Sequence, residues 1–324
     1  MEWHARLSRQ RDSDSEPAIQ LDPDIQRFVN EVSAAWAAHG DLAAMSFPQV
    51  RQVAEKVRAK WRSGGPAIAS ITERSIPTRI RVYDPEPGRV KPAFIYLHGG
   101  GWTFGSLDTH DRLMREYAAR TGMAVIGVDY ALSPEAKFPV AQDQVVAVAR
   151  YVAGHASEFT IDPQRIAIGG DSAGGNLALT TCIRLRDDGD QIMRAMVLNY
   201  AVLDRQSSND ARTHLGSPGN MLTYDEMEGF WRNYLREDDD PLEPLISPLR
   251  ANLRDLPSTL LVVPEFDLLT EQSQFFASRL QSANVWGKLA MYRGATHSFL
   301  EAMSIAPLAQ RAIVETADWL RATV

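Results

Sequence analysis

The stretch "IAIGGDSAGGNLAL", residues 166–179, carries the clearest structural signal in the chain. Residues 165–171 form a short apolar run, which predicts a buried strand. Residues 173–189 have a helical pattern, and Gly189 ends it. The stretch therefore predicts a strand, a sharp turn at Ser172 and a helix.

The turn contains the pattern G-x-S-x-G, formed by Gly170, Ser172 and Gly174. A strand before this pattern and a helix after it are the context in which it presents a nucleophile. Larger side chains two positions before and after the serine would collide in so sharp a turn. Ser172 Oγ is then expected above the sheet at a helix N-terminus, where a developing anion is favoured. The alternative is a glycine-rich turn whose serine only caps the helix.

Strands and helices alternate along most of the remaining chain. Near-continuous apolar strands between helices indicate an α/β fold with a mostly parallel sheet covered on both faces. Strands are expected at residues 78–85, 92–98, 123–130, 165–171, 194–202, 258–267 and 286–297. Helices are expected at residues 110–121, 139–156, 173–189, 271–282 and 306–323.

Two segments lie outside this alternation. Residues 1–63 contain two helical patterns, and residues 205–248 are polar with one amphipathic stretch. Open α/β sheets place their sites at the carboxyl ends of the strands. We therefore expect these segments to form a small two-part helical cap over that edge, with residues 64–204 and 249–324 as the core.

A serine needs an adjacent base to become a good nucleophile. The triad order that accompanies this turn is serine, then acid, then histidine. Only His214 and His297 follow Ser172, and His214 lies in the polar segment assigned to the cap. His297 follows the last expected strand, so we predict that it is the base.

The acid is expected after the preceding strand, in "PEFD" at residues 264–267. We expect that strand to end near Val263. Asp267 lies nearer the next helix and is the preferred acid, and Glu265 is the alternative. The acid would hold the tautomer of His297 and stabilise its imidazolium form without taking the proton.

Three consecutive glycines follow the strand at residues 92–98, in "HGGGW". Acyl transfer builds negative charge on the former carbonyl oxygen, and backbone N–H groups are its usual stabilisers. We predict an oxyanion hole formed by the amides of Gly100, Gly101 and Ala173. A flexible loop and a phosphate-binding turn are the alternatives, but no G-x-x-x-x-G-K-[ST] motif occurs.

Composition limits the other function classes. The formal net charge of -7 argues weakly against nucleic acid and anionic membranes as partners. The sequence contains no run of about 18 apolar residues and no apolar signal segment near its start. Cys182 is the single cysteine, and the seven histidines are scattered. We therefore expect no membrane span, no metal, no cofactor and a cytoplasmic location.

Four motifs in this order resemble the hormone-sensitive-lipase-like branch of the α/β hydrolases, the bacterial carboxylesterases. They are "HGGGW", "GDSAGGN", "EFD" and "HSF". Residues 97–118 and 125–141 look particularly like the bacterial acetyl esterases of that branch. The resemblance covers residues 78 to 324 and implies an α/β-hydrolase fold, a two-part cap and no cofactor.

The resemblance also assigns roles to residues. It implies a triad of Ser172, Asp267 and His297, with Gly100, Gly101 and Ala173 as the oxyanion hole. It further implies a structural brace formed by Asp129, Tyr130, Pro134 and Glu135. Two departures concern loop shape: Leu268 follows the acid where the family often has proline, and Ser298 follows the base where glycine is commonest.

The function predicted from these motifs is a serine carboxylesterase for short acyl esters, from acetyl to about hexanoyl. Phe230, Trp231 and Tyr234 are expected either to limit the acyl chain or simply to pack the cap. The alternatives are an amidase or deacetylase with the same triad, and a non-catalytic ligand-binding protein. The expected partner is a small-molecule ester, and a homodimer is possible.

Overall fold

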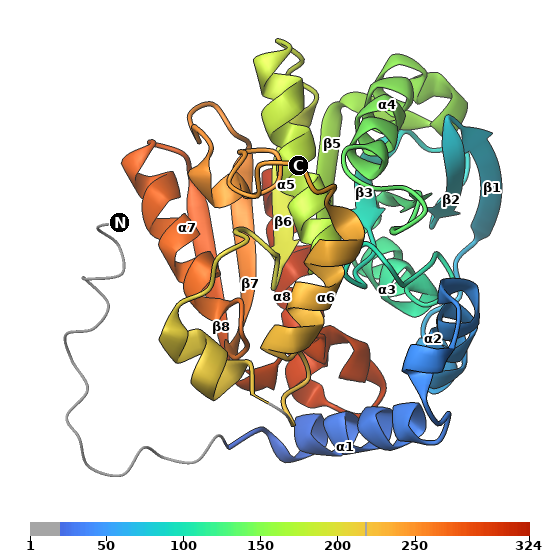
Figure 1. Ribbon diagram of the computed structural model, residues 1–324. Coiled ribbons are helices and arrows are strands. Elements are labelled where there is room, and N and C mark those ends of the chain that lie inside the picture. Colours follow the sequence, from blue (N-terminus) through green and yellow to red (C-terminus); the bar gives the residue numbers. More distant parts are fainter. Residues whose placement is uncertain (1–19, 218) are drawn as a thin grey trace.

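The computed structural model describes residues 20–217 and 219–324, and its sheet contains eight strands (Figure 1). The expectations for residues 1–19 and for Pro218 lie outside the described residues. The strand order is β1-β2-β4-β3-β5-β6-β7-β8, and only β2 runs against its neighbours. The strands are β1 Ser70–Ile76, β2 Thr78–Asp84, β3 Lys91–Leu97, β4 Ala124–Asp129, β5 Ile161–Asp171, β6 Met193–Asn199, β7 Ser258–Phe266 and β8 Gly287–Thr296.

Helices cover both faces of this sheet. The apolar side chains of α4, α5 and α7 pack in one core cluster, and those of α3 and α8 pack in the other. The α-helices are α1 Pro23–Ala37, α2 Phe47–Arg62, α3 Asp111–Thr121, α4 Val140–Gly154, α5 Ala173–Asp187, α6 Tyr224–Tyr234, α7 Thr270–Ser282 and α8 Pro307–Thr323. Short helical turns are η1 Leu42–Ala44, η2 Ala156–Phe159, η3 Ala211–Leu215, η4 Pro248–Arg250 and η5 Phe299–Ser304. The predicted α/β architecture is confirmed.

The central strands end at one level of the sheet. In the parallel pairing of β3 with β5, Leu97 lies opposite Gly170, and in that of β5 with β6, Asp171 lies opposite Asn199. Because parallel strands bring their carboxyl ends to one edge, the segments after β3, β5, β7 and β8 emerge there together. All the predicted site residues lie on these segments.

Two strands differ from the sequence-based expectation. β1 was not predicted, because this edge strand is polar and mostly exposed and so lacks an apolar run. The strand expected to end near Val263 continues as β7 to Phe266, with a register shift against β8 between Pro264 and Phe266. Pairing with β8 therefore continues beyond Val263, and the extra residues of the shift lie on β8.

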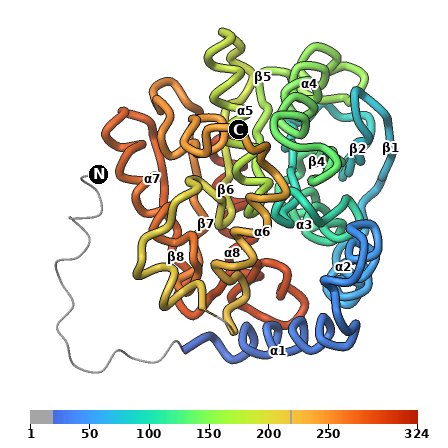
Figure 2. The backbone as a smooth tube through the Cα atoms, viewed as in Figure 1, coloured from blue at the N-terminus to red at the C-terminus, as the bar shows by residue number. Residues whose placement is uncertain are grey.

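The two N-terminal helices lie together at the lower end of the molecule in Figures 1 and 2. Asp22 caps α1 by accepting hydrogen bonds from the amides of Asp24 and Ile25, at 3.0 and 3.3 Å. The Asp22 amide in turn donates to the carbonyl oxygen of Gly294 at the end of β8 (2.9 Å). The start of α1 is therefore fixed directly to the carboxyl edge of the sheet.

The segment between β6 and β7 contains η3 and α6. A capping box starts α6: the Glu226 amide donates to Thr223 Oγ1 (3.2 Å), and the Thr223 amide donates to Glu226 Oε2 (2.8 Å). Met227, Trp231 and Tyr234 are buried at helical spacing. Trp231 and Tyr234 are thus packed inside, whereas Met227 also contributes to the cavity described below.

Candidate active site

Ser172 occupies the turn between β5 and α5 with a φ of 53° and a ψ of −118°. Residues with a side chain rarely adopt a positive φ, and such strain persists only where neighbours fix it. The Ser172 amide donates to the carbonyl oxygen of Asn199 (2.9 Å), and its own carbonyl accepts from the Val202 amide (3.2 Å). The end of β6 and the segment after it therefore hold the turn in place.

Two glycines give this turn the space it needs. A Cβ atom at Gly170 would lie 2.4 Å from the carbonyl oxygen of Leu97, and one at Gly174 would lie 2.0 Å from the same atom. Both distances are far below van der Waals contact, and the obstacle is the backbone of β3, which cannot move aside. This is the steric reason for the G-x-S-x-G spacing that the sequence suggested.

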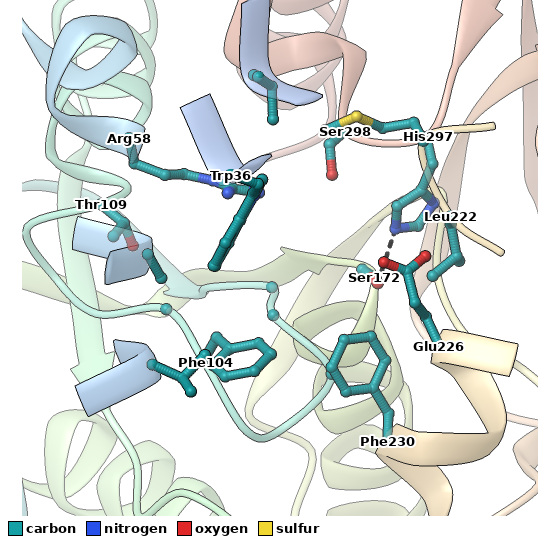
Figure 3. Close-up of a pocket in the computed structure, with 18 of the residues that line it drawn as sticks. Trp36, Arg58, Phe104, Thr109, Ser172, Leu222, Glu226, Phe230, His297 and Ser298 are labelled. Carbon is teal, nitrogen blue, oxygen red and sulfur yellow. Dashed lines mark hydrogen bonds between the residues drawn. The ribbon is translucent and has the colours of Figure 1, made fainter. Parts of the chain in front are cut away.

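Ser172, His297 and Asp267 form a continuous line of contacts (Figure 3 shows the first). Ser172 Oγ lies 3.0 Å from His297 Nε2, and His297 Nδ1 lies 2.8 Å from Asp267 Oδ2. Their exposed fractions are 7%, 6% and 2%. Although Ser172 precedes α5, its side chain makes no capping hydrogen bond. The capping alternative does not describe this serine.

The structure brings Asp267, and not Glu265, to the histidine. Asp267 follows the end of β7, and its Oδ1 accepts a hydrogen bond from the Leu269 amide (3.1 Å), which fixes the carboxylate. Glu265 Oε2 accepts instead from the amide of Gly294 in β8 (2.9 Å). The register shift between β7 and β8 lies at this point, and the two acidic side chains reach different partners.

The loop that carries His297 is held by its neighbours. Thr296 Oγ1 donates to the carbonyl oxygen of Phe266 (2.8 Å), which ties the end of β8 to the end of β7. The ring of Tyr200 packs edge-on against His297, with centroids 5.0 Å apart. Ser298 has a φ of 58°, a conformation that glycine adopts most easily. Ser298 thus departs from the glycine that the family resemblance implies at a position where glycine would be unstrained.

The glycine loop after β3 turns beside Ser172. Gly100 and Gly101 have φ values of 118° and 59°. The Gly100 carbonyl accepts from the amides of Thr103 and Phe104, at 3.0 and 2.8 Å. Among residues 20–217 and 219–324, no acceptor is assigned to the amide of Gly100 or Gly101. The Ala173 amide lies in the first turn of α5, where N–H groups have no acceptor within the helix.

Comparison with known proteins agrees with this geometry. A family model described as the alpha/beta hydrolase fold matches residues 94–301. An acetyl esterase of Salmonella paratyphi A is 34% identical over 297 residues, which are 89% of this chain and 89% of the relative. The chain belongs to the hormone-sensitive-lipase-like branch of the α/β hydrolases. Its class is that of the carboxylic ester hydrolases.

Solved structures of esterases are also similar to this hydrolase. A hyperthermophilic esterase from the archaeon Pyrobaculum calidifontis has a TM-score of 0.87 at 32% identity, over 94% of this chain and 98% of that one. A thermophilic carboxylesterase cloned from a metagenomic library has a TM-score of 0.83 at 31% identity, over 87% and 98% of the two chains. The family resemblance drawn from the motifs is confirmed.

The described residues contain neither a candidate metal site nor a helix that could span a membrane. In the described part of the hydrolase, no three or more histidine, cysteine or acidic side chains gather as a metal site would require. None of the helices within residues 20–217 and 219–324 is long and apolar enough to cross a membrane.

A buried carboxylate links the glycine loop of the hydrolase to the nucleophile turn. Asp171 Oδ1 accepts hydrogen bonds from the Tyr96 hydroxyl (2.8 Å) and the Gly99 amide (3.1 Å), and Oδ2 lies 3.3 Å from His110 Nε2. Burial alone raises the pKa of the Asp171 carboxyl, but the His110 charge and these hydrogen bonds outweigh it and hold that pKa below its usual range. Asp171 therefore stays ionised directly behind Ser172.

His110 is the partner of this carboxylate. From the sequence, His110 was predicted only to begin the helix that is α3. Burial lowers the pKa of the His110 imidazole, but the Asp171 carboxylate outweighs burial and raises that pKa above its usual range. The sequence offered one indication of a role for these residues, because His110 and Asp171 both lie in the segments that resemble the family. Nothing local in the sequence says that they meet.

His98 belongs to the same buried group as Asp171 and His110. Burial, aided by the charge of His110, lowers the pKa of His98 to about 4, so this imidazole is neutral at pH 7. The Tyr130 ring stacks on His98 with centroids 4.3 Å apart, and its hydroxyl donates to the His98 carbonyl oxygen (2.7 Å). Elsewhere in the predicted brace, Glu135 is hydrogen-bonded to Arg51 of α2 at 3.0 and 2.6 Å.

A cavity of about 750 Å³ opens in front of Ser172 and His297. Its floor is the strand edge, defined as residues 99–101 with Ser172, His297 and, behind the histidine, Asp267, which does not itself line the cavity. The opposite side is the helical wall, defined as the cavity-lining residues between 32 and 58 and between 220 and 230. Figure 3 shows Trp36, Phe104 and Phe230 of the cavity lining around the space in front of Ser172.

The aromatic residues expected to face the substrate divide between two roles. Phe230 lines the cavity, as the sequence allowed. Trp231 and Tyr234 do not line it: they are buried against Trp102, with ring centroids 4.7 and 4.3 Å away. Adjacent helical positions point about 100° apart, so Phe230 and Trp231 cannot share a face. The alternative of simple cap packing holds for Trp231 and Tyr234.

Proposed function

We propose that this protein is a serine carboxylesterase for short acyl esters, from acetyl to about hexanoyl. The observation that carries the proposal is the unbroken line of contacts from Asp267 through His297 to Ser172. This is the arrangement in which a base activates a serine and a carboxylate orients the base.

In the proposed mechanism, Ser172 Oγ attacks the ester carbonyl carbon while its proton passes to His297 Nε2. The tetrahedral intermediate then collapses, the bond to the alcohol breaks, and His297 returns the proton to the departing oxygen. Water deprotonated by His297 attacks the acyl-enzyme, releases the carboxylic acid and restores Ser172. Asp267 stabilises the imidazolium without taking its proton.

The negative charge of each intermediate is assigned to the amides of Gly100, Gly101 and Ala173. The free donors of the glycine loop and the first-turn position of Ala173 support this assignment. Loss of one such donor typically costs about 3–4 kcal/mol of transition-state stabilisation. Asp171 supports the same loop, because its carboxylate accepts from the Gly99 amide.

The preference for short acyl groups rests on the cavity and on the relatives. The rings of Phe104 and Phe230 meet edge-to-face in the cavity lining, with centroids 5.8 Å apart. Both rings lie around the space in front of Ser172, where they would contact an acyl chain (Figure 3). The Salmonella relatives are named acetyl esterases, which supports small acyl groups here as well.

The division of the chain is part of the same proposal. Residues 1–63 and 205–248 act as a two-part cap, and residues 64–204 and 249–324 are the catalytic core. The cavity lining supports this division, since most of the helical wall comes from α1, α2 and the segment around α6. The buried single cysteine, Cys182, supports a cytoplasmic location.

The test is a series of p-nitrophenyl esters from acetate to dodecanoate, measured with the wild type and with Ser172→Ala. The wild type should be fastest between acetate and hexanoate, and Ser172→Ala should lose at least about a thousandfold in kcat. Full activity in Ser172→Ala would overturn the mechanism. A fastest rate on matched amides would favour the amidase alternative instead.

Covalent labelling separates an enzyme from a non-catalytic binding protein. A fluorophosphonate should add to Ser172, with the adduct seen by intact-protein mass spectrometry. Ser33 supplies the control, because it also lines the cavity and is exposed. The adduct should persist in Ser33→Ala and disappear in Ser172→Ala, whereas an unlabelled wild type would point to a binding protein.

A further inference from the structure

The cavity contains an ion pair that the proposed mechanism does not use. Arg58 of α2 and Glu301 of η5 both line it, and Arg58 Nε lies 2.7 Å from Glu301 Oε2. Their side chains are 19% and 10% exposed. Glu301 lies only four positions after His297, so the pair stands in the same cavity as the proposed nucleophile and base.

Arg58 has hydrogen-bond donors to spare. A guanidinium carries five N–H groups, and the shortest contact with Glu301 is made by Nε. Across the described residues, no acceptor is assigned to either Nη atom of Arg58. Glu301 is also incompletely satisfied, because its contact with Nε is an ion contact without an aligned hydrogen bond. Figure 3 shows the Arg58 side chain extending toward Trp36, and both residues line the cavity.

The surroundings make the unsatisfied carboxylate oxygen costly. Val32, Trp36 and Ala54 line the same cavity, and Val32 and Ala54 are buried. The buried Oε2 atom of Glu301 has no aligned hydrogen-bond donor, and a bound group that donates to it offsets that cost. The arrangement therefore suits a ligand that donates to Glu301 and presents oxygen to Arg58.

Charge decides which oxygen fits. Glu301 already neutralises Arg58, and nearby His110 is paired with Asp171 in the same cavity lining. A substrate carboxylate would add a negative charge beside Glu301 and Asp171. Among the described residues that line the cavity, Arg58, His110 and His297 are each already paired with a carboxylate. A hydroxyl group is neutral, accepts from Arg58 and can donate to Glu301. It satisfies both members of the pair at once.

We propose that Arg58 and Glu301 form a subsite for a hydroxyl group of the substrate that is remote from the scissile ester. The inference rests on the proposed esterase function and names its substrate class: esters of polyols or of hydroxy acids. Arg58 is a specificity-determining residue in this assignment and takes no part in bond making or breaking.

The experiment compares matched pairs of acetates. Each pair is an alkyl acetate and the acetate of a diol of the same length, with a terminal hydroxyl in place of a terminal methyl. A second series places the hydroxyl on the acyl chain. Wild-type kcat/KM should favour the hydroxyl member at one length, where the group reaches Arg58, and the methyl member at the others.

Arg58→Met keeps the length of the side chain and removes the donors. It should reduce the hydroxyl preference by roughly tenfold to a hundredfold, the usual effect of a hydrogen bond to a charged group, with alkyl acetates changed by less than about threefold. Arg58→Met/Glu301→Gln gives the same readout without an unpaired carboxylate. Arg62→Met is the control, since Arg62 forms a more distant pair with Glu55 (3.6 Å) outside the cavity lining.

Two results separate this inference from the proposed function. If the wild type hydrolyses alkyl acetates but shows no hydroxyl preference at any length, or keeps it in Arg58→Met, the subsite is wrong and the esterase stands. If the wild type hydrolyses none of the esters, the esterase proposal fails. Calorimetric binding of the same pairs to Ser172→Ala then decides the subsite, which requires tighter binding of the hydroxyl member that is lost with Arg58→Met.

Discussion

The strand edge and the helical wall face each other across one cavity, yet their side chains are held in different ways. At the strand edge, Ser172, Asp267 and His297 are almost fully buried and each hydrogen-bonds to another strand end or loop. In the helical wall, Trp36 and Phe230 are partly exposed, and both make ring contacts with Phe104.

This difference follows from what each region has to do. Proton transfer and anion stabilisation need atoms placed to within a few tenths of an ångström, which directional hydrogen bonds between rigid strands provide. Substrate fit needs only shape, and non-directional apolar contacts provide that at lower precision. Substitutions at the strand edge should therefore change rate, and those in the helical wall should change preference.

The largest effect is expected from the acid of the strand edge. Asp267→Asn should lower kcat by about 10³- to 10⁴-fold, because an amide cannot hold the required tautomer of His297 or stabilise its charged form. Glu265→Gln is the matched control and should change kcat by less than about threefold, since Glu265 contacts the Gly294 amide. Steady-state kinetics on p-nitrophenyl acetate checks both. Equal losses of kcat in the two variants would mean that Asp267 is not the specific partner of His297.

A second prediction tests where the two regions touch. A Cβ atom at Gly101 would lie 2.3 Å from the Phe230 ring, so Gly101→Ala should displace the loop and lower kcat by about 10²- to 10³-fold. Because the obstacle is a side chain of the helical wall, Phe230→Ala in the same protein should recover most of the loss.

Gly88→Ala is the control that separates the steric contact with Phe230 from the effect of strain at a positive φ. Gly88 has a φ of 85°, and nothing lies within 4 Å of its Cβ position. This variant should lose about 1 kcal/mol of unfolding free energy and no activity. If Phe230→Ala gave no recovery in Gly101→Ala, strain in the loop would explain the defect in place of the contact with α6.

The third prediction concerns the buried histidines beneath the strand edge. The pKa of His98 is lowered to about 4, so the unfolded chain binds more protons than the folded one between pH 6.5 and 4. Unfolding free energy should fall across that window as the pH drops, by up to about 3 kcal/mol from this group. His98→Asn should flatten that part of the profile in urea titrations, and an unchanged slope would show that His98 is not the group responsible.

His110 should affect the pH dependence of stability in the opposite direction from His98. Its pKa is raised, so its contribution is present below pH 6.5 and is lost as the pH rises through the folded-state value. His110→Asn should therefore flatten the alkaline side of the same stability profile. An unchanged alkaline slope in this variant would show that the pair with Asp171 is not ionised.

The smallest effect is expected from the helical wall. Trp36→Ala should enlarge the cavity and shift the preferred p-nitrophenyl ester to a longer chain, with a three- to tenfold change in the ratio of kcat/KM values and little change on acetate. Apolar pocket contacts of one or two methylene groups have effects of this size. A large loss on acetate would instead place Trp36 among the residues that position the reacting ester.

The strand edge was largely predictable from the sequence, and the exceptions have physical reasons. The order of Ser172, Asp267 and His297 follows from where parallel strands end. The choice between Asp267 and Glu265 was harder, because both lie where the register of β7 against β8 shifts, and such a shift leaves little trace in an apolar pattern. The edge strand β1 was missed for a different reason, since it is polar and mostly exposed.

The sequence by itself determined which residues stand at the carboxyl ends of the strands and where glycine is required. Both follow from local patterns, namely strand and helix periodicity and the G-x-S-x-G motif, although the backbone that limits the space at Gly170 and Gly174 belongs to β3. Tertiary structure alone decided that His110 meets Asp171, that Phe230 faces the cavity while Trp231 does not, and that Arg58 meets Glu301. Such contacts depend on how separate segments pack and rotate against one another, and no local pattern records that.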